Sequence, residues 1–243
     1  ANREESTWNS NYKAVHHLQG NSTDSTANGN DGTNTAVAWE QQNNSVGADF
    51  NGTTSDIDLG SGSSIDDIFD GGGSISVWVN PNSDGEGSAA RIMDKRGTNL
   101  GWMYKVEGEA SGLMKLRLYY EFSTTDGDWI TTNTVLPINE NTKVDLFYNN
   151  DSIENNPTLV INGIKYTVGS GLTRTTKPAG TRLTDAAQSL EIGNKPTADV
   201  TWDGLIDEVR ISDTSRPSSE AITSYNAEKS DSDIITAGDE NTQ

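Results

Sequence analysis

Residues 202–211 read Trp202-Asp203-Gly204-Leu205-Ile206-Asp207-Glu208-Val209-Arg210-Ile211, an alternation of apolar and polar residues that predicts a β-strand. Successive side chains of a strand point to opposite faces. Strict alternation therefore gives one face with Leu205, Asp207, Val209 and Ile211, and another with Ile206, Glu208 and Arg210. A carboxylate in an apolar row is costly without partners. Asp207 is thus expected to accept hydrogen bonds from backbone N–H groups or a histidine, or to bind a cation.

The rest of the chain carries further strand-like runs between clusters of glycine, asparagine and aspartate. Gly, Asn, Ser and Thr supply 100 of the 243 residues, whereas 32% are hydrophobic, including 6 Trp, 7 Tyr and 4 Phe. A thin core of aromatic and β-branched residues beneath a large polar surface is typical of a β-sandwich with long loops. We therefore predict an all-β fold, a two-sheet antiparallel β-sandwich with at most one or two short helices.

The predicted strands cover residues 14–18, 36–39, 48–50, 56–59, 75–79, 90–94, 101–106, 114–122, 129–132, 142–148, 158–161, 164–168, 189–192 and 204–211. The two-residue Asn162-Gly163 between two such runs predicts a tight hairpin. Helical patterns occur only at 65–69 and 218–228. With no internal repeat or linker, we expect one domain over residues 1–229, followed at 230–243 by an acidic tail or a last edge strand.

An oxygen-rich loop near the N-terminal end offers a partner for Asp207. It reads Asp24-Ser25-Thr26-Ala27-Asn28-Gly29-Asn30-Asp31-Gly32-Thr33, and its two glycines allow carbonyl groups to turn inward. The spacing does not fit an EF-hand loop. Taken alone, such a loop is more often a turn between strands, so its interpretation as a cation site depends on Asp207.

Charge and composition limit the classes of ligand. With 17 basic and 36 acidic residues the formal net charge is −19, which argues against nucleic acid and anionic membranes as partners. The chain has no Cys and 2 His, so a bound metal needs oxygen ligands, which favours Ca²⁺ or Mg²⁺. No apolar run approaches the roughly 20 residues of a membrane span. The start at Ala1 is compatible with a processed product or an excised domain.

Several motifs together resemble a known family. They are Tyr12-Lys13-Ala14-Val15-His16-His17-Leu18 with the loop at 24–33, Phe50-Asn51-Gly52, Ile75-Ser76-Val77-Trp78-Val79-Asn80-Pro81, Leu159-Val160-Ile161-Asn162-Gly163, Leu190-Glu191-Ile192-Gly193, and the segment 202–212. Their order resembles that of the laminin-G-like, concanavalin A-like lectin/glucanase domains over nearly the whole chain. Lys143-Val144-Asp145 departs from the family, many members of which carry a Trp-His pair there.

The resemblance implies a jelly-roll sandwich with one concave sheet and with termini that lie close together. It also implies a structural Ca²⁺ between the N-terminal loop and the last long strand. The matching positions in this chain are Asp24, Asn28 or Asn30, and Asp207. We therefore expect calcium as a cofactor, with these four residues as candidate ligands.

The sequence argues against catalysis on this scaffold. Glycosidases of this shape need a Glu-x-Asp-x-x-Glu motif or a close relative on one strand, and none occurs. No nucleophile elbow or cysteine nucleophile is present. A glycoside hydrolase or polysaccharide lyase remains a lesser alternative, and we expect that the protein is not an enzyme.

Carbohydrate recognition would use aromatic faces against sugar rings and polar groups for the hydroxyls. The candidate ligand-binding residues are Trp102, Tyr104, Arg117, Tyr119 and Trp129. For each aromatic the alternative is packing in the core. Alternation in 116–122 places Arg117 and Tyr119 on the polar face, which is the better candidate for a ligand site.

Two non-catalytic functions follow from these observations. The first is an extracellular binding or adhesion module that recognises glycans on a calcium-stabilised jelly roll. The second is a structural or decoration component of a virion, fibre or cell envelope that acts through contacts with neighbouring protein chains. Both predict an extracellular, cell-surface or virion-surface location, without nucleic acid and without membrane insertion.

Overall fold

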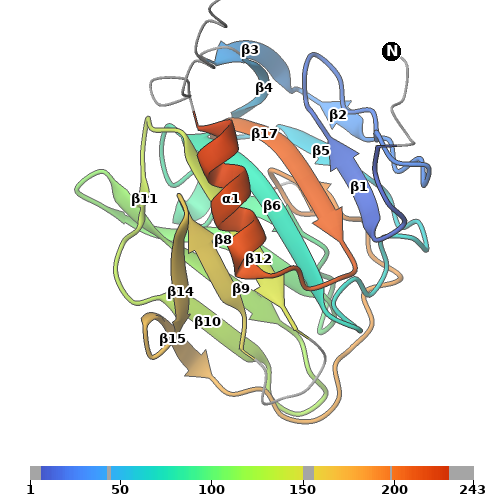
Figure 1. The fold of residues 1–243 in the computed structure, drawn as a ribbon, viewed down its shortest axis with the longest axis vertical. Helices are drawn as coiled ribbons and strands as arrows, with labels where there is room; N and C mark the ends of the chain where they lie inside the picture. Colours follow the sequence, from blue (N-terminus) through green and yellow to red (C-terminus); the bar gives the residue numbers. More distant parts are fainter. Residues whose placement is uncertain (1–6, 43–44, 150–155, 198, 230–243) are drawn as a thin grey trace, which may run out of the picture.

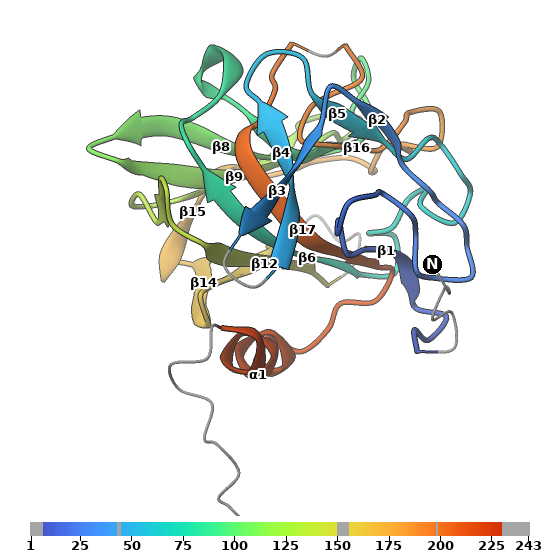
Figure 2. The ribbon, with the colours of Figure 1, turned by 90° about the horizontal axis from the view of Figure 1, so that it is seen from above.

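The computed structural model describes residues 7–42, 45–149, 156–197 and 199–229. Over these residues the chain forms two packed β-sheets, one α-helix and a single 3-10 turn at Glu86–Ser88 (Figure 1). The all-β prediction is confirmed. The helix α1 lies against one sheet and the second sheet lies behind it, so the molecule has three layers (Figure 2). The predicted tail at 230–243 lies outside the described residues.

Sheet A is built around β17. It contains β1 (Tyr12–His16), β3 (Ala38–Gln42), β4 (Ser45–Asn51), β6 (Gly73–Pro81), β12 (Thr142–Tyr148), β13 (Thr158–Ile161), β14 (Ile164–Val168) and β17 (Asp203–Ser212). β6 pairs along one edge of β17, and β4 and β1 share the other edge. β12, β13 and β14 follow beyond β6, with the predicted hairpin at Asn162-Gly163 between the last two.

Sheet B lies behind sheet A. It contains β2 (Thr33–Thr35), β5 (Asp56–Asp58), β7 (Arg91–Asp94), β8 (Trp102–Ala110), β9 (Leu113–Tyr120), β10 (Gly127–Thr131), β11 (Leu136–Pro137), β15 (Gly171–Thr176) and β16 (Glu191–Ile192). Its order is β2, β5, β16, β7, β8, β9, β10, β15, and β11 pairs with β9. β14 pairs in parallel with β15 and joins the two sheets, whereas the other described ladders are antiparallel.

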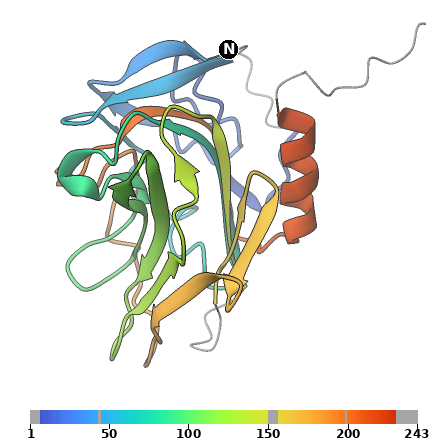
Figure 3. The same ribbon diagram turned by 90° about the vertical axis from the view of Figure 1, so that its left-hand side faces the viewer.

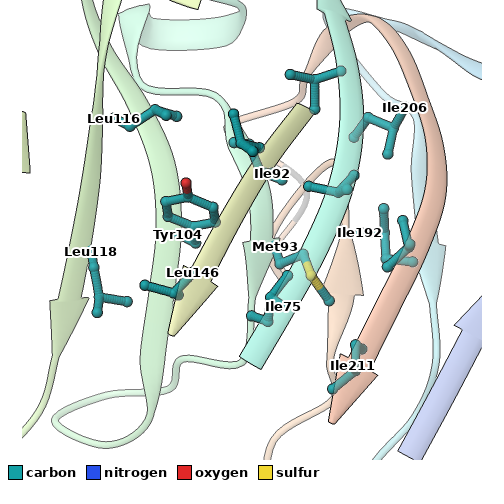
Figure 4. Close-up of a cluster of buried hydrophobic side chains, with 14 of the residues drawn as sticks. Ile75, Ile92, Met93, Tyr104, Leu116, Leu118, Leu146, Ile192, Ile206 and Ile211 are labelled. Carbon is teal, nitrogen blue, oxygen red and sulfur yellow. The ribbon is translucent and has the colours of Figure 1, made fainter. Parts of the chain in front are cut away.

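The hydrophobic core fills the space between the sheets. Ile75 and Leu146 of sheet A face Tyr104 and Leu116 of sheet B, and all four are fully buried (Figure 4). Phe69, from the connection before β6, forms edge-to-face contacts with three further rings, those of Trp102, Tyr120 and Tyr148, at centroid distances of 5.1, 5.9 and 5.8 Å. These four aromatic residues thus lie where they exclude most water.

Strict alternation along β17 is wrong, because a β-bulge interrupts the strand. Glu208 has a φ of +50°, and the pairing with β6 shifts between Asp207 and Arg210. A bulge inserts one residue and changes which side chains face the core. Ile206 and Val209 therefore both lie in the core, each fully buried.

The bulge also changes the setting of Asp207. Leu205 and Asp207 both lie next to Gly47 of β4, on the side of the strand away from the core. Asp207 is buried, and its Oδ1 accepts a hydrogen bond from the backbone N–H of Glu208 at 2.9 Å. Asp207 is therefore not a lone carboxylate in an apolar row, and its place in the strand does not by itself require a cation.

Helix α1 (Ser218–Glu228) has the bounds that the sequence predicts and covers the outer face of sheet A (Figure 3). Ala221 packs against Phe147 and Val160. At its C-terminal end Glu228 accepts hydrogen bonds from Lys143 Nζ at 2.5 Å and Arg210 Nη1 at 2.7 Å. Burial raises the pKa of Glu228, but the hydrogen bond from Lys143 and the charge of Arg210 outweigh burial and hold the pKa at about 2. Within the described residues, no helix is long and apolar enough to cross a membrane.

The predicted strands all correspond to strands of the structure, with small differences at the ends. β2, β11 and β15 are not predicted, since Thr33-Asn34-Thr35 and Gly171–Thr176 carry almost no large apolar residues. The prediction of a helix at 65–69 is wrong. These residues form turns that bury Ile65, Ile68 and Phe69 against the core.

Candidate functional site

The outer face of sheet B points away from α1 (Figure 3), and most of the side chains on it are polar or charged. Trp102, Tyr104 and Val106 of β8 face the core, so Met103 and Lys105 face outward, and β9 alternates in the same way. We call this surface the polar face: Asp56, Asp58, Arg91, Asp94, Met103, Lys105, Glu107, Arg117, Tyr119, Glu121, Asp128, Ile130 and Glu191. The register aligns Asp58, Glu191, Asp94, Met103, Tyr119 and Asp128 in one row across six strands.

Arg117 is the centre of an ion-pair network on this face. Its Nε and Nη2 donate to the two carboxylate oxygens of Asp128 at 2.8 and 2.7 Å, and its Nη1 donates to Glu107 at 2.5 Å. Lys105 Nζ lies 3.1 Å from the same Glu107 oxygen. Paired guanidinium and carboxylate groups hold one another in fixed orientations. The side chain of Arg117 is 24% exposed, so part of it stays available to a ligand.

Tyr119 lies beside Arg117 and is held at both ends. The guanidinium of Arg96 covers its ring at 4.8 Å, and its hydroxyl donates to Asp126 Oδ2 at 2.5 Å. Arg96 Nε also donates to Glu121 at 2.7 Å. Burial and the hydrogen bond to Asp126 raise the pKa of Tyr119, so the phenol keeps its proton. The partly exposed ring thus has a fixed orientation beside several charged groups.

The other end of the row is a cluster of carboxyl groups around Glu191. Its strand neighbours are Asp58 on one side and Asp94 on the other, and Glu191 is only 4% exposed. Burial, followed by repulsion from Asp58 and Asp56, raises the pKa of Glu191 to about 8. At neutral pH this residue therefore carries a proton and shares a hydrogen bond with Asp56.

Glu191→Gln should make the protein more stable in alkaline solution. The folded-state pKa lies above the ordinary value of 4.5, so the stability that the proton contributes is full below pH 4.5 and is lost as the pH rises through 8. The neutral amide removes this loss. We expect a melting temperature at pH 9 at least about 3 °C above wild type, the shift that roughly 1 kcal/mol produces in a domain of this size. Thermal melts at pH 5 and pH 9 check this. Equal pH dependence in the two proteins would contradict it, and exposed Glu140→Gln is the control.

The ligand-binding candidates divide between the two sides of sheet B. Arg117 and Tyr119 lie together on the polar face. Trp102, Tyr104 and Trp129 are fully buried in the core, so the prediction that they offer ring faces to a ligand is wrong. The indole N–H groups also find partners inside the protein, Asp185 for Trp102 at 3.0 Å and Asn156 for Trp129 at 2.9 Å.

Asp24 is buried, and its carboxylate accepts a set of hydrogen bonds from protein groups. Its Oδ1 accepts from the backbone N–H groups of Val15 and Thr26 at 3.0 and 2.9 Å. Its Oδ2 accepts from the Thr26 hydroxyl and the Asn30 N–H at 2.8 and 2.9 Å. Both oxygens are thereby occupied, and the carboxylate ties β1 to the loop that follows it.

Asn28 and Asn30 of this loop also form hydrogen bonds with the backbone. The side-chain amides of Asn28 and Asn30 each donate to the carbonyl oxygen of Lys13, at 3.0 and 2.7 Å. Among the described residues, no group of three or more Asp, Glu, His or Cys side chains converges as a metal site. Asp24, Asn28, Asn30 and Asp207 as arranged do not fit a calcium ion. The prediction of a bound calcium ion therefore rests only on the family resemblance.

Several residues of the polar face were not predicted from sequence. Beside that face, Asp126 lies in the loop before β10 and Arg96 lies in the loop after β7, so neither position carries a strand pattern that points to Tyr119. Lys105 and Glu107 could have been found by applying to β8 the alternation that was applied to β9, because the two strands pair along their length.

Comparisons with known proteins give the family and the fold. A family model described as the concanavalin A-like lectin/glucanases superfamily matches residues 50–221. A search of curated proteins finds no match.

Solved structures with the same fold include domain 4 of AbnA, a GH43 extracellular arabinanase from Geobacillus stearothermophilus, in complex with arabinotriose. The TM-score is 0.63 at 21% identity, over 87% of this chain and 97% of that domain. The binding domain of Paraclostridial Mosquitocidal Protein 1 gives a TM-score of 0.67 at 17% identity, over 89% of this chain and 52% of that one. The binding domain of Botulinum neurotoxin DC in complex with SialylT gives 0.59 at 11%, over 89% and 51%.

The chain thus spans about half of each toxin binding domain and nearly all of the arabinanase domain. At these identities the solved structures show a shared fold, and the family model covers most of the chain. The protein belongs to the concanavalin A-like lectin/glucanases superfamily.

Proposed function

We propose that the protein is a non-catalytic glycan-binding module and that the polar face of sheet B is its binding surface. The observation that carries this proposal is the pair Arg117 and Tyr119, two partly exposed neighbouring side chains that are both fixed by ion pairs and hydrogen bonds. A sugar ring packs on an aromatic face while its hydroxyls bond to charged groups nearby. Groups held in place before binding lose little entropy when the ligand arrives.

The charges of the polar face favour an uncharged glycan. Its carboxyl groups outnumber its basic side chains, so a sulfated or sialylated glycan would meet net repulsion. Carboxylates accept hydrogen bonds from sugar hydroxyls, and Arg117 donates to ring or hydroxyl oxygens. The arabinanase domain with the same fold was solved with arabinotriose, an uncharged oligosaccharide, and this supports the same ligand class here.

The carboxyl cluster does not favour a hydrolase. A raised pKa beside a second carboxylate is the pattern of a glycosidase general acid. Glu191, however, is 4% exposed and lies between Asp58 and Asp94 in the sheet, which leaves a glycosidic oxygen little room to approach it. We assign the cluster to the stability of the sheet. An extracellular setting, as for the arabinanase, is part of the proposal.

A glycan array tests the proposed function. We expect the wild-type protein to bind a set of neutral oligosaccharides and Tyr119→Ala to lose about tenfold in affinity for them, because about 1.4 kcal/mol of ring contact is removed. Tyr225→Ala is the matched control, since this partly buried tyrosine lies on α1, on the other side of the molecule. No binding across the array, or equal losses in the two variants, would contradict the proposal and favour a function through protein contacts.

A further inference from the structure

A pocket lies between α1 and the outer face of sheet A, on the opposite side of the molecule from the polar face. Its floor consists of two cross-strand rows, Asp145–Ser76–Arg210 and Phe147–Ser74–Ser212, which run across β12, β6 and β17. Arg216 from the connection before α1, and Ala221 and Ser224 of the helix, complete the walls.

Small side chains on both walls create this space. The central strand carries Ser74 and Ser76 at successive outward positions, and the helix sets Ala221 and Ser224 over them. The pocket has a volume of about 50 Å³ and is partly open to solvent. A water molecule needs roughly 10–15 Å³ of such space, so the pocket has room for about three or four waters or for a small polar group of that size.

Three polar atoms on side chains that line the pocket have no hydrogen-bond partner among the residues that the structure describes. They are Asp145 Oδ2, Arg210 Nε and Arg216 Nε, each buried and each on a side chain that lines the pocket. Asp145 is only 2% exposed. Leaving a buried donor or acceptor unpaired costs about 1–3 kcal/mol, so a molecule in the pocket that pairs with all three gains that energy.

The charges around the pocket select the kind of molecule. Arg210 and Arg216 disfavour a cation, whereas Asp145 and Glu220 disfavour an anion. Burial raises the pKa of Asp145 to about 6, so at neutral pH it is mostly ionised and accepts hydrogen bonds. One acceptor with two donors therefore suits a neutral group that both donates and accepts, as hydroxyl groups do.

We infer that the pocket under α1 is a second binding site and that it takes a vicinal diol, the adjacent hydroxyl pair of glycerol or of a sugar ring. One hydroxyl donates to Asp145, and the diol oxygens accept from Arg210 and Arg216. The ring of a sugar stays at the open side of the pocket, because the enclosed space holds only the diol itself. This site uses no residue of the polar face and does not depend on the proposed function.

The test is an NMR titration in which the arginine Nε–H signals are followed in ¹⁵N–¹H spectra of the whole protein. Glycerol and methyl α-mannopyranoside are the two diol probes, and 1,3-propanediol, which has no adjacent pair, is the control ligand. We expect the signals of Arg210 and Arg216 to shift in a saturable way with a vicinal diol and not with 1,3-propanediol. A response to glycerol alone identifies a free polyol as the ligand, whereas a response to both probes identifies a glycan end.

Two variants establish where the diol binds. Asp145→Ala should weaken the response at least about tenfold, while Arg117→Ala, which changes the polar face, should leave it unchanged. Ser74→Val narrows the pocket without removing a charge, so it should abolish the response even if Asp145→Ala folds poorly. If the Arg210 and Arg216 signals do not shift, or shift equally with 1,3-propanediol, the pocket holds water only and the inference is overturned.

Discussion

Replacing Lys95 by methionine should cause one of the two largest losses of stability in this protein. Lys95 is fully buried, and its Nζ donates to the carbonyl oxygens of Gln188 and Asp185 and to Asp66 Oδ1, at 2.6, 3.1 and 3.0 Å. It thereby joins the loop at 184–190 to the turns at 65–69. Asp185 in turn accepts from the indole N–H of Trp102 at 3.0 Å, which links the cluster to the core.

Methionine keeps most of the length of the lysine side chain but removes the charge and all three donors. Removing one partner of a buried ion pair costs about 3–5 kcal/mol, because the remaining carboxylates are left uncompensated. With roughly 2–4 °C per kcal/mol in a domain of this size, we expect the melting temperature to fall by about 10 °C. Lys165→Met on the exposed face of β14 is the matched control. Melts of Lys95→Met and of the control that coincide within 1 °C would contradict this account.

Replacing Asp24 by alanine should cause the second large loss. Three backbone N–H groups, those of Val15, Thr26 and Asn30, lose their acceptor, and all three residues are buried. At about 1–3 kcal/mol for each buried unsatisfied donor, we expect a loss of at least about 3 kcal/mol. Thermal or urea unfolding measures it. Asp24→Asn, which keeps one acceptor oxygen, should recover part of the loss.

The same variant also tests the calcium prediction. If hydrogen bonds explain the burial of Asp24, its replacement costs the same stability in EDTA as in calcium, and EDTA leaves the wild-type melt unchanged. A wild-type protein that EDTA destabilises, with no further loss in Asp24→Ala, would instead show that Asp24 binds a cation. That result would restore the ligand set implied by the family resemblance.

The fold was largely predictable from sequence because alternating runs bounded by Gly, Asn and Asp mark most of the strands. Residues 142–148, 158–161, 164–168 and the helix 218–228 have the predicted bounds. β15 was not predicted, because Leu172 is the only large apolar residue of this strand. The position of β15 is set by its pairing with β10 rather than by its own sequence pattern. The bulge at Glu208 also escaped, since it depends on how β17 meets β1, β4 and β6 at once.

The candidate site was predictable only in part. Alternation placed Arg117 and Tyr119 on the outward face of β9, and the structure agrees. The same rule applied to β8 places Trp102 and Tyr104 beside the core residues of β9, so the alternation could have predicted that they are buried. The contacts of Tyr119 with Arg96 and Asp126 could not be predicted, because both partners lie in loops whose paths no local sequence pattern specifies.

The pocket under α1 illustrates a third limit. The serines of β6 and the helix pattern at 218–228 are each visible in the sequence. That Asp145 and Arg210 flank the same serine depends on the order of β12, β6 and β17 in the sheet. Sequence order does not reveal this, since β6 ends at Pro81 and β12 begins only at Thr142.

The crystal structure of the protein with the neutral oligosaccharide that binds best on the array tests the central claim most directly. The account predicts a sugar ring against Tyr119, with hydroxyl groups within hydrogen-bond distance of Arg117 and of the carboxylates of Glu107 or Asp128. A glycan bound on the loops or on the outer face of sheet A, with the polar face free, would contradict it.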